Sequence, residues 1–325
     1  MENKDIIKKR AKEFIKNFIL FIILMLVALL SFSRLIHKDK SDSNQNDSTD
    51  ETEIFLAEQI EDKIKSIEER YECINIIESG EEKEYIGFEY KISNDERKKL
   101  SALEGIDTIL GRLPDNILEE GLDMYGGKLK EKYGYDVPPD NGLNIVLCSE
   151  INNFKSDNII VTGKMDYDTN DKIVNIFINV NYSGDVANIF SHELYHFFKG
   201  RIGMQKLVEE VYTDEDWKNE LPKGYKYYGS KTNLDSMPYT VKTEQDINNV
   251  YFVTEYSQKN IDEDKCEIFS YLLSTDEDEE LPKAYESPHV RNRALMIIRE
   301  FEECYDTVDE NAYWNRIFEE KTSGQ

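Results

Sequence analysis

Histidine and cysteine are scarce in this 325-residue sequence, which contains four of each. The wide spacing of the cysteines excludes a zinc ribbon and a CxxC redox motif. We expect Cys148 and Cys266 to be small buried side chains on a strand and a helix. The sequence also lacks an internal repeat with a period of about 20–50 residues, which excludes a solenoid or propeller.

Basic residues are few compared with acidic ones: 40 Lys and Arg stand against 66 Asp and Glu, a net charge of −26. Residues 1–40 hold nine basic and four acidic residues, so they carry +5 and the remainder (31 basic, 62 acidic) carries −31. A body this acidic repels phosphate backbones, which excludes nucleic acid as a partner. The hydrophobic fraction of 39% supplies a packed core and excludes wholesale disorder.

Charge is absent from Asn17 to Ser33, a run of seventeen residues that follows a basic N-terminal segment. The run reaches the length that spans a bilayer, so we predict a transmembrane anchor at 17–36. The heavier positive charge before it places residues 1–16 in the cytoplasm and the body outside the cell. In the alternative, a signal peptide cleaved near Ser33, the body is secreted. The polar residues 37–53 predict a solvated linker.

The first part of the body is predicted to be helical. Apolar residues recur at helical spacing over 53–76, 95–111 and 115–132. Pro114 separates the last two segments. We therefore expect residues 54–140 to form a helical N-terminal part of the exported body.

The pattern then changes to strands and back to helices. Three strands are predicted, with the Asp-rich residues 166–171 as a hairpin turn between the last two: Leu143–Cys148, Asn158–Thr162 and Ile173–Val180. A buried helix is expected over Asp185–Gly200, ended by Gly200. Residues 205–250 are predicted to be a long loop or insertion, followed by helices over 249–275 and 287–304. This order predicts an α+β domain over 141–325.

The sequence HELYH at 192–196 carries the chemistry. His192 and His196 are one helical turn apart on the same face, so both imidazoles can bind one Zn²⁺ at about 2.0–2.1 Å. Glu193 points about 100° away and can act as general base toward a water molecule at the metal. This is the HExxH motif of zinc metallopeptidases. In the alternative, these are two core histidines with satisfied ring nitrogens. Lys199 and Ile202 exclude the three-histidine pattern HExxHxxGxxH.

The residues that follow the motif contain several candidates for a third metal ligand. Glu263 and Glu267 are four residues apart, on one face of a predicted helix. One can bind the metal while the other holds a ligand histidine. Glu209, Glu210 and Glu255 are the other candidate ligands.

The residues Tyr256, Glu263 and Glu267 follow HExxH in the form Y-x6-E-x3-E-x-F. Over about 172–271 the chain resembles the glutamate-zincin peptidases of the anthrax lethal factor and bacterial Pro-Pro endopeptidase type. The resemblance implies a zincin-like fold, in which a small mixed sheet packs on the active-site helix and the C-terminal part is largely helical. The offset of 67 positions from His196 to Glu263 is longer than the family leads us to expect, and we attribute it to an insertion at about 205–250.

The resemblance also implies roles. His192, His196 and Glu263 would bind one Zn²⁺ per chain, and Glu193 would be the general base. Glu267 would orient a ligand histidine, and Tyr256 would donate a hydrogen bond to the oxyanion.

Together these features predict a membrane-anchored extracellular zinc endopeptidase that hydrolyses peptides or proteins. In zincins a strand beside the active helix binds the substrate, and Ile173–Val180 is expected to be that strand. The alternative is a non-catalytic surface binding or sensor ectodomain with a structural or vestigial metal site.

Overall fold

The computed structural model describes residues 47–80, 83–85, 88–134, 136–153, 160–182, 185–208, 212–229 and 237–322. Its contacts divide the chain into two units, Met1–Ile54 and Phe55–Gln325. The predicted cytoplasmic segment 1–16 and anchor 17–36 lie outside the described residues. Among the helices that are described, none combines the length and the apolar character needed to cross a membrane.

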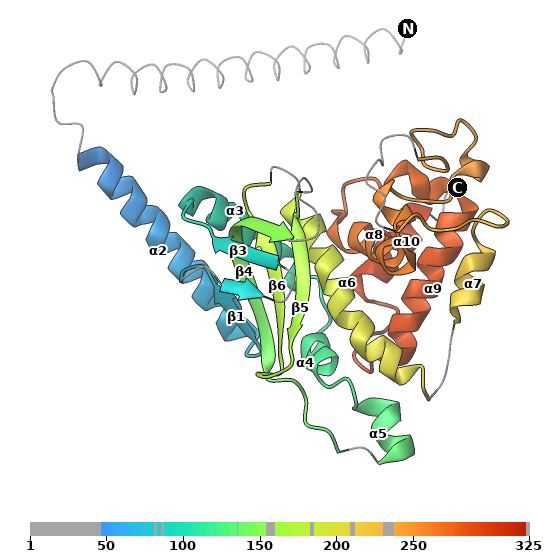
Figure 1. Ribbon diagram of the computed structural model, residues 1–325, viewed down its shortest axis with the longest axis horizontal. Helices are drawn as coiled ribbons and strands as arrows, with labels where there is room; N and C mark the ends of the chain where they lie inside the picture. Colours follow the sequence, from blue (N-terminus) through green and yellow to red (C-terminus); the bar gives the residue numbers. More distant parts are fainter. Residues whose placement is uncertain are drawn as a thin grey trace, which may run out of the picture. The chain divides into compact units, whose positions relative to one another are not determined.

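A six-stranded mixed sheet forms one half of the second unit (Figure 1). Its strands are β1 (Ile74–Ile77), β2 (Lys83–Tyr85), β3 (Phe88–Ile92), β4 (Gly142–Asn153), β5 (Gly163–Asp168) and β6 (Ile173–Asn179). The order is β2-β3-β4-β6-β5. The first half of β4 pairs in parallel with β1, and its second half pairs antiparallel with β3. On its other side β4 pairs in parallel with β6.

The hairpin between β5 and β6 lies at one edge of this sheet. Of the strand predicted over Asn158–Thr162, residues 158–159 lie outside the described residues and residues 160–162 are not in a strand. The strand at this edge of the sheet runs instead from Gly163 to Asp168. The Asp168 side chain accepts hydrogen bonds from the main-chain N–H groups of Asn170 and Asp171 and so fixes the turn. The strand Ile173–Val180 is confirmed, to within one residue, as β6.

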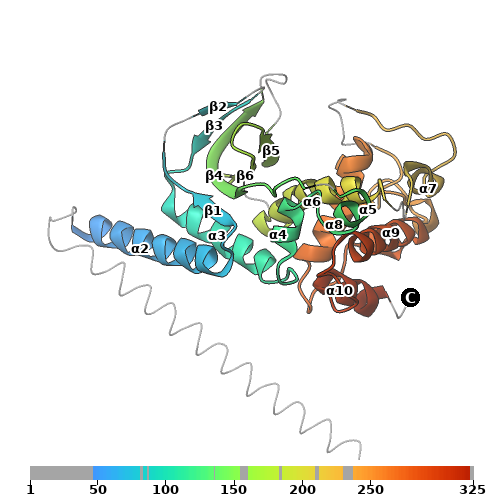
Figure 2. The same ribbon diagram turned by 90° about the horizontal axis from the view of Figure 1, so that it is seen from below.

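The described α-helices are α2 (Asp47–Arg70), α3 (Glu96–Leu110), α4 (Ile117–Leu122), α5 (Gly127–Tyr133), α6 (Val186–Gln205), α7 (Asp214–Asn219), α8 (Ile261–Ser274), α9 (Pro288–Cys304) and α10 (Tyr313–Thr322). Three short 3-10 helices accompany them: η1 (Ile247–Asn249), η2 (Tyr256–Gln258) and η3 (Lys283–Glu286). The helices predicted over 95–111 and 287–304 are confirmed as α3 and α9. The C-terminal part is helical, with α8 and α9 packed against α6 (Figures 1 and 2).

The N-terminal part of the body differs from the prediction. Helix α2 begins at Asp47, inside the predicted linker, and ends at Arg70 rather than near residue 76. Ile74 and Ile76 are buried while Asn75 between them is exposed, the period-two pattern of a strand. The segment 54–140 therefore contributes β1, β2 and β3 to the same sheet as β4.

Two further helix boundaries also differ. The helix expected over 115–132 is broken into α4 and α5, and Gly127 begins α5 with φ at +56°. Helix α6 runs past Gly200 to Gln205, so Gly200 is not its cap. A Cβ at Gly200 would lie 3.0 Å from the Met124 sulfur, so glycine there permits the close approach of the α4–α5 connection.

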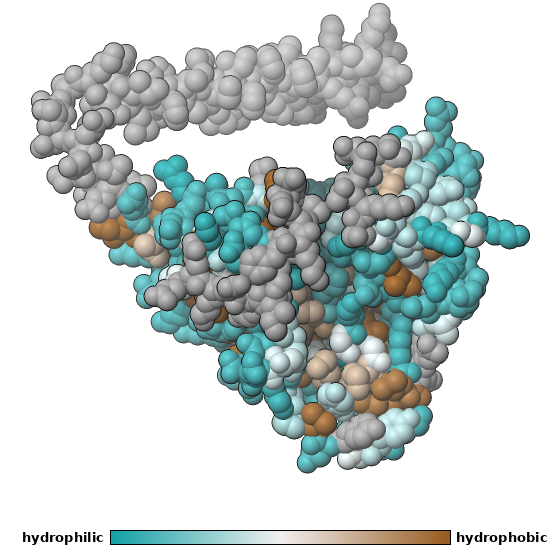
Figure 3. Space-filling view, viewed as in Figure 1, coloured by the Kyte–Doolittle hydropathy of each residue, from teal (hydrophilic) through white to brown (hydrophobic). Residues whose placement is uncertain are grey.

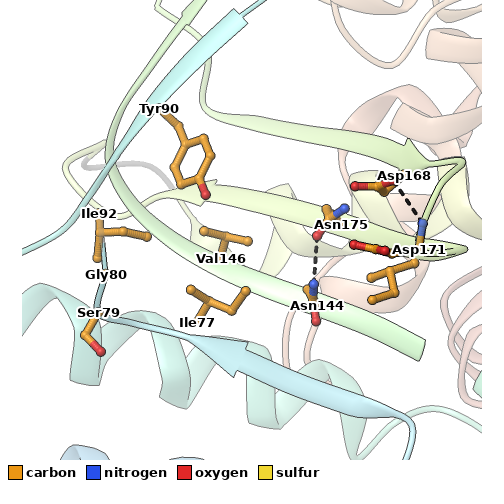
Figure 4. Close-up of a pocket in the computed structure, with 11 residues that line it drawn as sticks. Ile77, Ser79, Gly80, Tyr90, Ile92, Asn144, Val146, Asp168, Asp171 and Asn175 are labelled. Atoms are coloured by element: carbon orange, nitrogen blue, oxygen red, sulfur yellow. Dashed lines mark hydrogen bonds between the residues drawn. The ribbon is translucent and has the colours of Figure 1, made fainter. Parts of the chain in front are cut away.

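The two faces of the sheet are unlike each other. One face packs on α3 and α6 through buried side chains such as Ile145 and Ile176. The opposite face carries a smaller apolar cluster that includes Val146 and Phe177. A cavity on this opposite face is lined in part by Asn144, whose amide donates to the Asn175 side chain at 2.9 Å (Figure 4). None of the residues of the HELYH motif lines this cavity.

The molecular surface is mainly hydrophilic, as the charge composition requires (Figure 3). Brown, apolar colour gathers in the lower part of the view, over α5 and the end of α6. Exposed apolar side chains of this region include Tyr133 and Leu207.

Candidate metal centre

Helix α6 presents the two histidines of the HELYH motif to helix α8. The helix starts where the Asp185 side chain accepts a hydrogen bond from the Asn188 N–H at 3.2 Å. One turn further on, the rings of His192 and His196 have their centroids 5.2 Å apart. His192 is 8% exposed, so these polar rings lie largely away from water and need polar partners.

Helix α8 supplies those partners. Its N-cap is Asn260, whose side chain accepts a hydrogen bond from the Glu263 N–H at 3.0 Å. Glu263, Cys266, Glu267 and Ser270 follow at helical spacing along one stripe. Asn188 of α6 donates to the Ser270 hydroxyl at 3.2 Å, so this stripe faces α6.

The carboxylates of this stripe meet both histidines. Oε2 of Glu263 lies 3.1 Å from Nε2 of His192 and 3.5 Å from Nε2 of His196. Oε1 of Glu267 lies 2.9 Å from Nδ1 of His192, while its Oε2 accepts from the Thr254 hydroxyl at 2.7 Å. His192 is therefore held between two carboxylates, and Glu267 is itself fixed by Thr254.

Cys266 lies in the same cluster. Its sulfur is 3.4 Å from Nδ1 and 3.4 Å from Nε2 of His196. The ligand atoms of His192, His196 and Cys266 all lie within 4.8 Å of one another, so these three residues form a candidate metal site. The sequence identified Cys266 correctly as buried but not as a possible donor. Its position between Glu263 and Glu267, on the face that they share, is the signal that was available.

The distances around Glu263 fit a divalent metal of the zinc type. Ligand atoms at about 2.0–2.1 Å from a tetrahedral zinc lie roughly 3.3 Å from one another. The separations of 3.1 and 3.5 Å from Glu263 Oε2 to the two Nε2 atoms lie on either side of this value. Two imidazoles and one carboxylate are also a donor set found in catalytic zinc sites, which leave a fourth position open.

The contacts between His192 and Glu263 shift the pKa of both groups. Burial lowers the pKa of His192, but hydrogen bonds to Glu263 and Glu267 outweigh it and raise this pKa to about 10. Burial raises the pKa of Glu263, but hydrogen bonds to His192 and His196 and the charge of Lys259 bring it well below its usual value. Without metal, His192 is thus a cation in contact with Glu263 and Glu267, and a metal ion can replace its proton.

Glu193 faces the sheet rather than α8. Its carboxylate accepts a hydrogen bond from the main-chain N–H of Met165 in β5, and burial raises its pKa. Gly163 makes this approach feasible, because a Cβ there would lie 2.9 Å from Oε1 of Glu193. Strand β5 therefore runs directly beside the predicted general base.

The strand predicted to bind substrate, Ile173–Val180, is paired on both sides. β6 (Ile173–Asn179) is paired with β4 on one side and with β5 on the other, so it has no edge to offer a peptide. Within the described sheet, β5 is the strand paired on one side only and lying beside α6. The prediction of Ile173–Val180 failed because adjacency in sequence to the helix does not decide which strand lies at the edge.

Tyr256 and Lys259 lie at the exposed side of the cluster. The Tyr256 ring centroid is 5.9 Å from that of His192, and the residue is 37% exposed. Nζ of Lys259 donates to the Tyr256 hydroxyl at 2.8 Å and to Oε1 of Glu263 at 2.7 Å. Among the other predicted ligands, Glu255 pairs with Lys242 at 3.0 Å, and Glu209 and Glu210 lie outside the described residues.

No protein-family model matches this sequence, and no curated protein matches it. A crystal structure of a candidate zinc-binding metallo-peptidase from Bacteroides caccae is similar, at 13% sequence identity and a TM-score of 0.31. The match covers 86% of this chain and 94% of the other. A likeness at this TM-score carries no argument about activity, which has to rest on the side chains of α6, α8 and β5.

Proposed function

We propose that this chain is a zinc-dependent endopeptidase of the glutamate-zincin type. One observation carries the proposal: a single oxygen of Glu263 faces Nε2 of both His192 and His196. Glu193 then stands one residue along the same helix and beside an edge strand. Two core histidines would need ring partners, but they would not need a shared carboxylate oxygen.

His192, His196 and Glu263 are the proposed metal ligands, with Cys266 as the competing third donor. An imidazole ring binds a metal through one of its two nitrogens. A second ligand of the same metal should therefore lie closer to that nitrogen than to the other nitrogen of the ring. Cys266 is equally far from both nitrogens of His196, whereas Glu263 contacts Nε2 of each ring. Bound there, Zn²⁺ supplies a Lewis acid that polarises the scissile carbonyl and lowers the pKa of a water molecule to about 7.

The chain's own residues then divide the work. Glu193 accepts the proton of the attacking water and delivers it to the departing amine, a role that its raised pKa favours. Glu267 accepts the Nδ1 proton of His192 and so keeps Nε2 directed at the metal position. Tyr256 donates a hydrogen bond to the oxyanion. A peptide adds to β5 as a further strand, which places its main chain beside Glu193.

The location and surroundings belong to the same proposal. The uncharged run at 17–33 and its basic flank support a single-pass anchor with the N-terminus in the cytoplasm and the catalytic body outside. The segment 205–250 would shape the cleft beside Lys259, whose carbonyl accepts a hydrogen bond from the Gly229 N–H of this segment at 2.8 Å. The second candidate function, a non-catalytic sensor ectodomain, keeps the metal but cleaves nothing.

The test is the substitution Glu193→Gln in the zinc-loaded exported body, assayed against a peptide library. We expect hydrolysis to fall by roughly 10³-fold or more, because the proton acceptor is lost, while zinc stoichiometry stays at the wild-type value. Unchanged hydrolysis would exclude Glu193 from the reaction. A wild-type protein that binds zinc and cleaves no peptide would favour the sensor ectodomain.

The ligand assignment has its own pair of variants. Glu263→Ala and Cys266→Ala remove neighbouring candidate donors from the same helix face. Zinc per chain, measured after gel filtration, should drop in Glu263→Ala and persist in Cys266→Ala. The reverse result would make Cys266 the third ligand.

A further inference from the structure

Lys259 contacts two members of the proposed site at once. We propose that Lys259 is a positioning residue that directs the proton of Tyr256 toward the substrate and selects which oxygen of Glu263 faces the metal. This inference rests on the proposed function, and neither the HExxH motif nor the downstream pattern Y-x6-E-x3-E-x-F includes Lys259.

The geometry holds the lysine in place from several directions. Its Nζ lies 2.8 Å from the Tyr256 hydroxyl, 2.7 Å from Oε1 of Glu263 and 4.8 Å from the centroid of the Tyr256 ring. Its carbonyl accepts from the Gly229 N–H at 2.8 Å, and its own N–H donates to the Tyr256 carbonyl at 3.0 Å. The backbone of Lys259 is thus hydrogen-bonded both to the turn that carries Tyr256 and to Gly229 of the segment 205–250.

Donor and acceptor chemistry decides what the contact with Tyr256 does. An ammonium group has three donors and no acceptor, so the phenol oxygen of Tyr256 must accept from Lys259. The hydroxyl proton of Tyr256 then points away from Lys259 and needs an acceptor elsewhere. The ring lies near His192, so the proton is available to the oxyanion that forms at the adjacent metal position.

The contact with Glu263 separates the two oxygens of that carboxylate. Oε1 accepts from Lys259, while Oε2 faces His192 and His196. A carboxylate whose second oxygen is held by a charged donor binds a metal through one oxygen, which keeps a coordination position open for substrate. Lys259 therefore acts on the ligand and on the oxyanion donor together.

The chain offers a matched control in Lys199. Its Nζ pairs with Asp262 of α8 at 2.7 Å, and its side chain is 36% exposed, against 35% for Lys259. Lys199→Met removes the same charge from the same neighbourhood without touching Tyr256 or Glu263. A general effect of charge on the site would therefore appear in both variants.

The first measurement is kinetic, with zinc-loaded protein and a cleaved peptide. Lys259→Met should lower kcat by roughly tenfold to a hundredfold with little change in KM, because orientation at the reacting atoms is lost and binding is not. Lys259→Arg should recover part of the loss, and Lys199→Met should match wild type. Tyr256→Phe should cost much less in the Lys259→Met background than in wild type, because the two residues act as a unit.

The second measurement does not depend on turnover. In protein labelled with ¹³C at tyrosine Cζ, the resonance missing from Tyr256→Phe identifies Tyr256. This resonance should shift in Lys259→Met and stay in place in Lys199→Met. In cobalt-substituted protein, the visible absorption of Lys259→Met should weaken as Glu263 binds through both oxygens, whereas that of Lys199→Met should not change.

The outcomes separate the two proposals. Wild-type protein that binds zinc without cleaving any peptide would overturn the proposed function. Cleavage by wild type, together with kinetics and spectra of Lys259→Met equal to those of Lys199→Met, would overturn the role of Lys259 alone. Additive losses in the double variant would likewise overturn it.

Discussion

Helix α8 has a buried polar cluster on each of two sides. One cluster is formed around Glu263 and the other around the next residue, Asp264. Glu263 faces α6, and its partners are the two imidazoles of α6 and Lys259, which precedes α8. Asp264 faces the other way, where it pairs with Arg293 and accepts from Trp217 at 3.1 Å and from Tyr227 at 2.9 Å. The carboxylates are one residue apart, yet their counter-charges differ in kind.

The difference is whether the positive charge can be replaced. A guanidinium is protonated at every relevant pH, so Arg293 neutralises Asp264 permanently. A nitrogen of an imidazole ring binds either a proton or a metal ion, so a metal ion can take the place of the proton on His192. We infer that the Asp264 cluster maintains the fold and that the Glu263 cluster is open to exchange. The Asp264 cluster also attaches α7 to α8: Trp217, in α7, donates to Asp264 and is 1% exposed.

The largest expected effect separates the two clusters by stability. Asp264→Asn should lower the free energy of unfolding by about 3–5 kcal/mol, because it leaves Arg293 as an uncompensated buried charge. Glu263→Gln should destabilise the metal-free protein less and weaken zinc binding by more than about a hundredfold. Urea unfolding and chelator competition measure the two quantities. Equal stability losses in both variants would contradict the comparison.

A smaller effect is expected at Gly163, where β5 approaches Glu193 of α6. A Cβ at Gly163 would lie 2.7 Å from Cγ2 of Ile189 and 2.9 Å from Oε1 of Glu193, so Gly163→Ala must displace β5 or the general base. Hydrolysis should fall by roughly tenfold to a hundredfold. Gly203→Ala is the control within α6, since a Cβ there meets nothing within 4 Å, and it should leave hydrolysis unchanged. A fully active Gly163→Ala would show that β5 does not position Glu193.

The pH dependence of zinc binding tests whether the proton on His192 is replaceable. In metal-free protein the pKa of His192 is raised to about 10, so below that pH the ring is protonated and must lose its proton when Nε2 binds a metal. Zinc binding near pH 7 should release a proton from His192, and the affinity should rise by about tenfold per pH unit. Calorimetry in buffers of different ionisation enthalpy counts the protons. Glu267→Gln, which removes a contact that raises this pKa, should weaken the dependence.

Much of the candidate site was predictable because it is local. The spacing of His192 and His196, and that of Glu263 and Glu267, is set by the helical repeat, so each pair was expected on one helix face before any fold was known. The structure brings these two pairs together. Lys259 and Thr254 were not found, because no residue spacing reveals which polar side chain will reach a carboxylate across a turn.

The fold was predicted least well where strands are short or polar. β5 contains Lys164, Asp166 and Asp168 and lacks the apolar run of a buried strand, so its residues were assigned partly to a turn. β1 has the period of a strand but follows a long helix without a turn-forming residue that marks the change. Helix α10 was not predicted, although Trp314 and Phe318 are buried at helical spacing.

The sequence alone determined which functional groups are available to the site: two imidazoles and a carboxylate on one helix, and two carboxylates on another. It did so because helix geometry fixes side-chain direction over a few residues. It also determined that an acidic body follows an uncharged N-terminal run. Tertiary structure alone decided which oxygen of Glu263 meets both rings, that Cys266 joins the cluster, and that β5 rather than β6 lies at the edge. These outcomes depend on how separate elements pack and pair, and contacts across 60 or more residues of chain leave no periodic trace in the sequence.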